Sequence, residues 1–197
     1  GLFQIAQETA QNNILCYVNA DIIMPESILD VINALQARKG KFMAVGYRWD
    51  LDVTDSVHFI DDEVRTNFWS EANKNTQKHA CTGIDYFIFR KGTFQYFPRL
   101  AIGRFGWDNW LLWKSRRMRI PLIDVSDEIF AIHQNHSYEF NEFKGESDIS
   151  SGREGQINQK ITEGDTSPCV LPNFWPRRQK ALLWSGIILN REFAEVR

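Results

Sequence analysis

The sequence predicts an α/β domain built around a mixed central sheet. Residues 14–18 form a short, continuous apolar run, which is typical of a strand buried on both faces. A helix follows, opened by Pro25 and with apolar side chains at helical spacing, and residues 42–47 form a second apolar strand. Strand, helix and strand in this order predict a right-handed crossover in which the two strands are parallel.

The other elements are predicted from the same periodicities. An amphipathic helix pattern over residues 2–10 begins directly after Gly1, with no cap or strand before it, so we expect the chain to continue a longer protein. The length of 197 residues suits one domain, or one domain with an appendage. Further along the chain we expect a polar, partly helical stretch at 61–75, strands at 84–89, 122–125 and 129–132, and a helix at 107–118.

Composition changes after residue 140, which divides the chain into a core over residues 1–140 and a second part over 141–197 of the same domain. Residues 142–168 are rich in Gly, Ser, Asp and Glu, with one short helix expected near 156–161. So few apolar residues cannot offset the entropy of ordering, which predicts a mobile lid, a linker or an acceptor loop. Apolar character returns at 181–184, which we expect to dock on the core.

Charge and cysteine content exclude several classes of protein. The 23 basic and 25 acidic side chains give a formal net charge of -2, so no basic field points to nucleic acid as a partner. No apolar stretch is long enough to span a bilayer, and we expect a cytoplasmic location if the protein is bacterial. Cys16, Cys81 and Cys169 form no CxxC pair, which argues against a zinc ribbon or a disulfide framework. Cys16, in an apolar run, is expected to be a small core residue.

The end of the first strand carries the first candidate site. Asn19 and Asp21 follow the apolar run, at the carboxyl end of a strand, where open α/β sheets bind ligands. An Asp held rigidly there suits Mg²⁺ or Mn²⁺, which bind carboxylate and phosphate oxygens. The same two residues could instead form a turn and cap the helix after Pro25, and the triplet alone favours that structural role.

The second candidate is Asp108, in the first turn of a predicted helix. Gly103 and Gly106 permit a tight backbone approach, and Trp107 and Trp110 flank the acid. A carboxylate beside large aromatic surfaces loses solvation, which raises its pKa and makes it a better base. Helix capping by the acid and core packing of the tryptophans are the alternative, and the sequence leaves both open for Asp108.

Further candidates follow two other strands. His133 could bind a metal, but in an extended strand His133 and His136 would point to opposite faces, so both could hold one ion only if the chain turned. A structural histidine is the simpler interpretation of each one alone. Asp50, which follows the second strand, could line the same cleft or pair with Arg48.

In this order, these segments resemble the GT-A glycosyltransferases, in particular their family-2-like bacterial and algal members. The resemblance covers about residues 1–140 and implies a GT-A-type, Rossmann-like domain with a mixed central sheet that is present only in part, since its first strands would precede Gly1. The matching stretches are 17–23, 45–50, 82–87, 106–110 and 131–136.

The resemblance also implies a role for each matching residue. Asn19 and Asp21 correspond to the DxD metal motif of the family, with Asn in place of the first Asp. The implied metal ligands are Asp21 with His133, more than His136, and the implied acceptor base is Asp108. The residues implied to bind donor or acceptor are Asn19, Trp49, Asp50, Thr82, Gly83, Asp85, Gly106, Trp107 and Asn109.

The expected activity is transfer of a sugar from a nucleoside-diphosphate sugar to a hydroxyl on a glycan, lipid or small molecule, with Mn²⁺ or Mg²⁺ and with inversion. Two alternatives stay open. A nucleotidyltransferase would need phosphate-cradling glycines near the N-terminus, and a catalytically silent carbohydrate-binding relative would keep Trp107 and the cleft without a metal. Missing strands would leave an open sheet edge beside residues 14–18, so the chain could self-associate.

Overall fold

The computed structural model describes residues 1–79, 83–104, 106–136 and 152–162, together with the backbone of two strands at 182–184 and 187–189. The helices are α1 (Leu2–Thr9), α2 (Ile28–Ala37), α3 (Asp62–Asn75), α4 (Trp107–Arg117) and α6 (Arg153–Thr162). The strands are β1 (Ile14–Val18), β2 (Ile22–Ile23), β3 (Met43–Val45), β4 (Arg48–Leu51), β5 (Gln77–Lys78), β6 (Tyr86–Arg90), β7 (Leu122–Asp124), β8 (Ala131–Gln134), β9 (Leu182–Trp184) and β10 (Ile187–Leu189). The chain is therefore α/β, as the sequence predicts.

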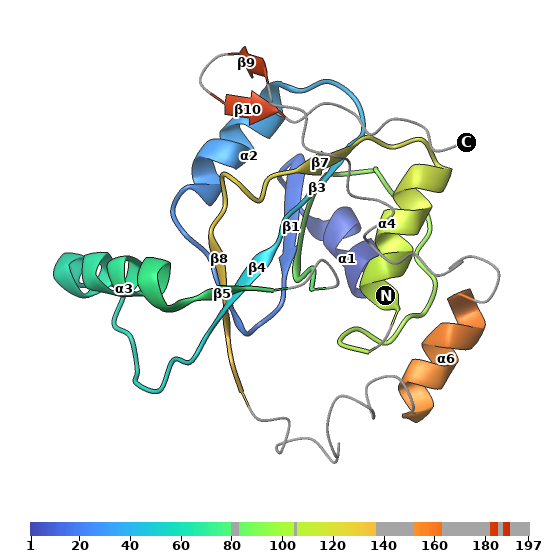
Figure 1. Ribbon diagram of the computed structural model, residues 1–197. Coiled ribbons are helices and arrows are strands. Elements are labelled where there is room, and N and C mark those ends of the chain that lie inside the picture. Colours follow the sequence, from blue (N-terminus) through green and yellow to red (C-terminus); the bar gives the residue numbers. More distant parts are fainter. Residues whose placement is uncertain (80–82, 105, 137–151, 163–181, 185–186, 190–197) are drawn as a thin grey trace.

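The main sheet has the order β1-β6-β3-β7, with α1 and α4 on one face and α2 on the other (Figure 1). Side chains of α1 and α4, such as Phe3 and Leu111, form one apolar cluster with the sheet, and those of α2, such as Val31 and Leu35, form a second. Burial on both faces explains why β6 is apolar along most of its length.

The two strands of the predicted crossover run in the same direction but are not neighbours. β1 and β3 each pair antiparallel with β6, which lies between them, and β7 pairs parallel with β3. The sheet is therefore mixed, as predicted. Local periodicity shows the direction of a crossover, but it carries no information about a strand inserted from later in the chain.

The expectation of a fully buried first strand is wrong. β1 lies at the edge of the described sheet, and Cys16 and Val18 are exposed, so Cys16 is not a core residue. The alternate residues Leu15 and Tyr17 pack against the apolar cluster beneath α1 and α4. An apolar run of five residues is compatible with both a central and an edge strand, and tertiary contacts decided between them.

A second sheet, β2-β8-β4-β5, continues from the first and positions most of the candidate site. The chain passes from β3 to β4 through Gly46, where a Cβ atom would collide with the Tyr86 hydroxyl. Only glycine allows this close crossing of the backbone over β6. Beyond it, β4 pairs parallel with β8 and antiparallel with β5.

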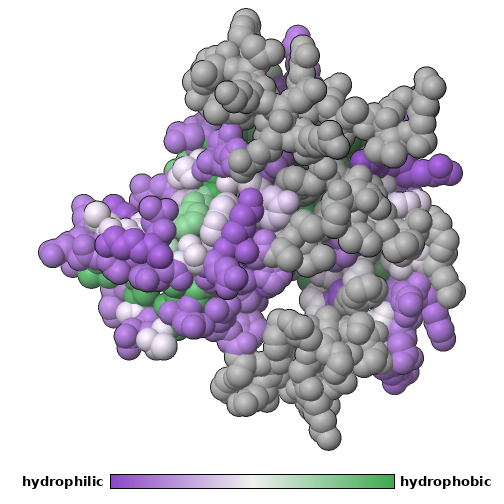
Figure 2. Space-filling model, viewed as in Figure 1, coloured by the Kyte–Doolittle hydropathy of each residue, from purple (hydrophilic) through white to green (hydrophobic). Residues whose placement is uncertain are grey.

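Helix α3 projects away from the two sheets and presents a mostly hydrophilic surface (Figures 1 and 2). Its N-cap Asp61 accepts hydrogen bonds from the backbone N–H groups of Glu63 and Val64, and Ala72 is its only buried residue. Among the described residues, no helix has the length and apolar character needed to cross a membrane.

Helix α6 confirms the short helix expected near residues 156–161. Its Asn158 is fully buried and mimics a backbone amide: Nδ2 donates to the carbonyl of Ala101 at 2.8 Å, and Oδ1 accepts from the N–H of Ala101 at 2.7 Å. An ion pair between Arg104 and Glu154 (2.8 Å) adds to this contact. The described part of the predicted lid is thus a docked helix, and the remainder of residues 141–197 lies outside the described residues, apart from the backbone of β9 and β10.

Candidate functional site

Asp21 lies beside two histidines at one end of the second sheet. β2 pairs antiparallel with β8 so that Ile22 is opposite His133, and the N–H of Gln134 donates to the carbonyl of Asp21 at 2.9 Å. Oδ2 of Asp21 is 3.5 Å from Nε2 of His133 and 3.1 Å from Nε2 of His136. One ligand atom from each of the three residues lies within 4.8 Å of the other two.

The structure brings His133 and His136 to the same place, although an extended strand would have separated them. Strand β8 ends at Gln134, and the N–H of Asn135 still donates to the carbonyl of Leu51 at 2.9 Å, beyond the last paired residue of β8. The side chain of His136 nevertheless reaches Oδ2 of Asp21. The centroids of the two imidazole rings are 5.6 Å apart. Both side chains therefore reach Asp21, which the extended strand alone did not predict.

This group fits a divalent cation. Ligand atoms that bind one ion at about 2.1 Å lie roughly 3.0–3.4 Å from one another, and the contacts of Asp21 with the two histidines fall close to that range. Oδ1 of Asp21 is buried and has no hydrogen-bond partner among the described residues, an arrangement that costs free energy unless a cation or donor approaches it. Side-chain contacts with His133 chiefly, and with His136, lower the pKa of Asp21 to about 2, so the carboxylate is ionised at neutral pH.

Asp50 connects His133 to the interior of the site. In the parallel register of β4 and β8, Asp50 lies opposite His133, and its Oδ1 is 3.1 Å from Nδ1 of that histidine. Oδ2 of Asp50 is 2.6 Å from Nδ1 of His79, and Nε of Arg48 is 3.2 Å from Oδ1. The expected pairing of Asp50 with Arg48 is therefore confirmed, as a charge contact without the geometry of an aligned hydrogen bond.

Arg48 bridges this cluster to a second carboxylate. Its Nη1 donates to Oδ2 of Asp85 at 2.6 Å, and Oδ1 of Asp85 accepts from Nδ2 of Asn19 at 2.6 Å. Oδ1 of Asn19 in turn accepts from the hydroxyl of Tyr17 at 2.8 Å. Asn19 is thus held by two neighbours, and a carboxylate at this position would face that of Asp85.

Replacing Asn19 with Asp, which would complete a DxD motif, is expected to destabilise the fold without improving metal binding. The new carboxylate would lose the donor that satisfies Asp85 and add a like charge, at a cost of about 1–3 kcal/mol. Urea denaturation at pH 7 and Mn²⁺ calorimetry measure the two effects. The same change at Asn12, in an exposed turn, is the control and should leave stability within about 0.5 kcal/mol. Tighter Mn²⁺ binding by the Asn19 variant would contradict this account.

Asp108 lies at the start of α4, behind the N-cap Gly106, whose φ of 88° is in the left-handed region that favours glycine. Burial chiefly, with a contribution from the charge of Asp85, raises the pKa of Asp108 to about 7, although the hydrogen bond from Asn109 and the charge of Arg48 act to lower it. The direction is the one predicted from the sequence. The charges of Asp85 and Arg48, the pair that also contacts Asn19 and Asp50, act on Asp108 as well.

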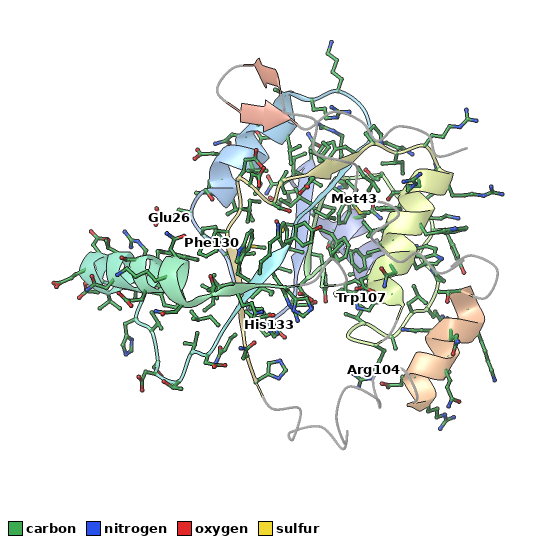
Figure 3. The ribbon with its side chains drawn as sticks, viewed as in Figure 1. Glu26, Met43, Arg104, Trp107, Phe130 and His133 are labelled. Atoms are coloured by element: carbon green, nitrogen blue, oxygen red, sulfur yellow. The ribbon has the colours of Figure 1, made fainter. Side chains whose placement is uncertain are left out.

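Two tryptophans proposed to bind sugars lie elsewhere. Trp107 is 5% exposed, and its ring packs against Phe3, Tyr17 and Phe87, so it belongs to the core (Figure 3). Trp49 lies on the face of β4 opposite to Asp50 and contacts Phe130. The ring of Trp107 is therefore used in packing, whereas Trp49 is half-buried, and neither is part of the site we propose.

The remaining candidates, Gly83, Asn109 and Thr82, differ in what they contact. Gly83 is buried, and a Cβ atom there would collide with the ring of His79 and lie 3.2 Å from Nε of Arg48, so its role is to admit those side chains. Asn109 is half-buried and donates its N–H to Asp108 at 2.8 Å. Thr82 lies outside the described residues.

Two participants in the network were not predicted from the sequence. Arg48 was considered only as a partner of Asp50, and no role was predicted for His79. The sequence offered one signal for His79. It lies four residues before Gly83, the glycine at the start of a predicted strand that also carries the candidate Asp85. Without the pairing of β4 with β5, nothing indicates that His79 faces Asp50.

Comparisons with known proteins found no relative. No protein-family model matches the chain, and neither the curated proteins nor the solved structures contain a match. The resemblance to GT-A glycosyltransferases therefore remains a prediction from the sequence. Any functional assignment has to be supported by the geometry of the site.

Proposed function

We propose that this chain carries the metal-binding and acceptor-activating part of a GT-A-type glycosyltransferase that uses a nucleoside-diphosphate sugar. One observation carries the proposal: a group of one carboxylate and two imidazoles that fits a divalent ion is linked through Asp50 and Arg48 to Asp85, whose charge acts on an acid with a pKa of about 7. Asp21, His133 and His136 form the first part, and Asp108 is the second.

In the proposed reaction, the metal ligands and Asp108 have separate roles. A divalent ion held by Asp21, His133 and His136 would supply positive charge for the diphosphate that leaves the donor sugar. Asp108 would accept the proton of the acceptor hydroxyl, because a base with a pKa near neutral is ionised for part of the time and still binds a proton well. Asp85 cannot take this role, since both of its oxygens accept hydrogen bonds from Arg48 and Asn19.

The donor set also bears on the identity of the ion. Mg²⁺ binds oxygen ligands and retains water, whereas imidazole suits Mn²⁺ and other transition ions. Two of the three protein ligands are imidazoles, so we expect Mn²⁺ to bind at least about tenfold more tightly than Mg²⁺. Isothermal titration calorimetry of the metal-free protein with each ion checks this, and equal affinities would show that the histidines do not coordinate.

The test of the reaction is a panel of nucleotide sugars incubated with the protein in its longest natural form, with and without Mn²⁺. Mn²⁺-dependent release of a nucleoside diphosphate from one donor, increased by a hydroxyl acceptor, is the expected result. Release of pyrophosphate from a nucleoside triphosphate and a sugar phosphate would instead indicate a nucleotidyltransferase. Sugar binding without turnover of any donor would indicate a catalytically silent relative.

A further inference from the structure

We infer that Asp50 is a positioning residue for the metal centre, which holds the imidazole of His133 so that Nε2 faces Asp21. This inference rests on the proposed metal site and extends it to a residue that binds neither the ion nor the substrate. Figure 3 shows His133 on β8, beside the strand that carries Asp50.

The direction of the hydrogen bond follows from the partners of Asp50. A carboxylate surrounded by donors can only accept, so Nδ1 of His133, at 3.1 Å from Oδ1, carries the hydrogen. The other ring nitrogen, Nε2, then faces Oδ2 of Asp21 at 3.5 Å. His133 is 6% exposed, so surrounding side chains also restrict rotation of its ring. The atom left to coordinate an ion is therefore selected by Asp50.

Asp50 is itself fixed by contacts that do not involve the metal. Nδ1 of His79 approaches Oδ2 at 2.6 Å, and Arg48 approaches Oδ1 at 3.2 Å while its Nη1 is tied to Asp85. The absence of a side chain at Gly83 leaves room for both His79 and Arg48. Because Oδ2 of Asp50 contacts His79 while Oδ1 contacts Arg48 and His133, rotation of the carboxylate would break contacts on both sides.

A ligating histidine whose second nitrogen donates to a carboxylate has its ring orientation fixed and its basicity raised. Loss of such an outer carboxylate lowers metal affinity about 10- to 100-fold in known metal sites. The same loss is expected here, and it should depend on His133, because Asp50 contacts the metal group only through that residue among the contacts described.

The experiment is a double-mutant cycle read out as Mn²⁺ affinity, measured by the electron paramagnetic resonance signal of the free ion. Asp50→Asn is expected to weaken binding about 10- to 100-fold in the parent and in the His136→Ala variant. In the His133→Ala variant the same change is expected to weaken binding less than about twofold, because the residue it positions is gone. Asp55→Asn, an exposed change of equal charge, is the control and should leave affinity unchanged.

An equal loss in all three backgrounds would overturn the inference, since it would reflect general damage to the fold. No loss in the parent would overturn it as well, and so would a parent protein that binds no Mn²⁺. If Asp50→Asn does not fold, Asp50→Glu keeps the charge beside Arg48 and His79 but displaces the carboxylate, and the same dependence on His133 is expected. A protein that shows this dependence but transfers no sugar would refute the proposed reaction and leave the role of Asp50 intact.

Discussion

Replacing Asp21 with Asn is expected to abolish Mn²⁺-dependent turnover and to weaken Mn²⁺ binding by more than about 100-fold, beyond the loss that follows removal of an outer partner. The reason is that Asp21 supplies the only carboxylate of the metal group among the described residues, and its Oδ1 has no other partner there. Asn keeps the shape of the side chain but not its charge. Calorimetry with Mn²⁺ measures the affinity, and Asp55→Asn serves as the charge-matched control.

The same variant should be slightly less stable than the parent without metal. The pKa of Asp21 is lowered to about 2 in the fold by its side-chain contacts with His133 and His136, against an ordinary value of 3.8. A lowered pKa stabilises the fold above about pH 4, and this contribution disappears as the pH falls toward 2. After screening of a partly exposed group, we expect a loss on the order of 1 kcal/mol at pH 7, or about 2–4 °C in Tm, and almost none at pH 2. Mn²⁺ affinity within threefold of the parent would show that Asp21 is not a ligand.

Replacing Asp108 with Asn is expected to lower kcat by about 10²- to 10⁴-fold while leaving donor KM and Mn²⁺ affinity within a few-fold of the parent. The base acts on the acceptor, so the contacts to the ion and the diphosphate survive its loss. In the parent, kcat should rise as the pH passes through about 7, because Asp108 has to be ionised to accept a proton. Steady-state kinetics from pH 5.5 to 8.5, an interval of about 1.5 units on each side of that pKa, test both statements.

The stability of the Asp108 variant provides an independent check. Burial raises the pKa of Asp108 to about 7 from an ordinary value of 3.8, so its ionised form is disfavoured in the fold. The protonated form of Asp108 is therefore favoured in the fold, and the stability that goes with it is fully present below about pH 4 and is lost as the pH rises through about 7. Asn at this position carries no charge, and we expect the variant to be more stable than the parent at pH 8 by on the order of 1–3 kcal/mol. A variant that is both fully active and less stable would return Asp108 to the role of a helix cap.

Several features of the fold followed from the sequence because they depend on local periodicity. The helices at residues 2–9, 28–37, 107–117 and 153–162 were predicted within a few residues of their observed bounds, as were the strands at 14–18 and 122–124. Each is encoded by apolar spacing and by glycine or proline at its ends, which neighbouring residues determine among themselves. The direction of the first crossover was predicted for the same reason.

The sequence by itself determined which residues could carry the chemistry: Asp21 after an apolar strand, Asp108 at a glycine-led helix start, and His133 at a late strand end. Only the tertiary structure decided which of them meet. Insertion of β6 between β1 and β3 left Cys16 at an edge, and aromatic neighbours from α1 and β6 drew Trp107 into the core. Pairing of β8 with both β2 and β4 brought His133, His136 and Asp50 together across more than 80 residues of chain. Contacts of this kind form where segments far apart in the sequence together bury the most apolar area and satisfy the most polar groups. No short stretch of sequence contains that information.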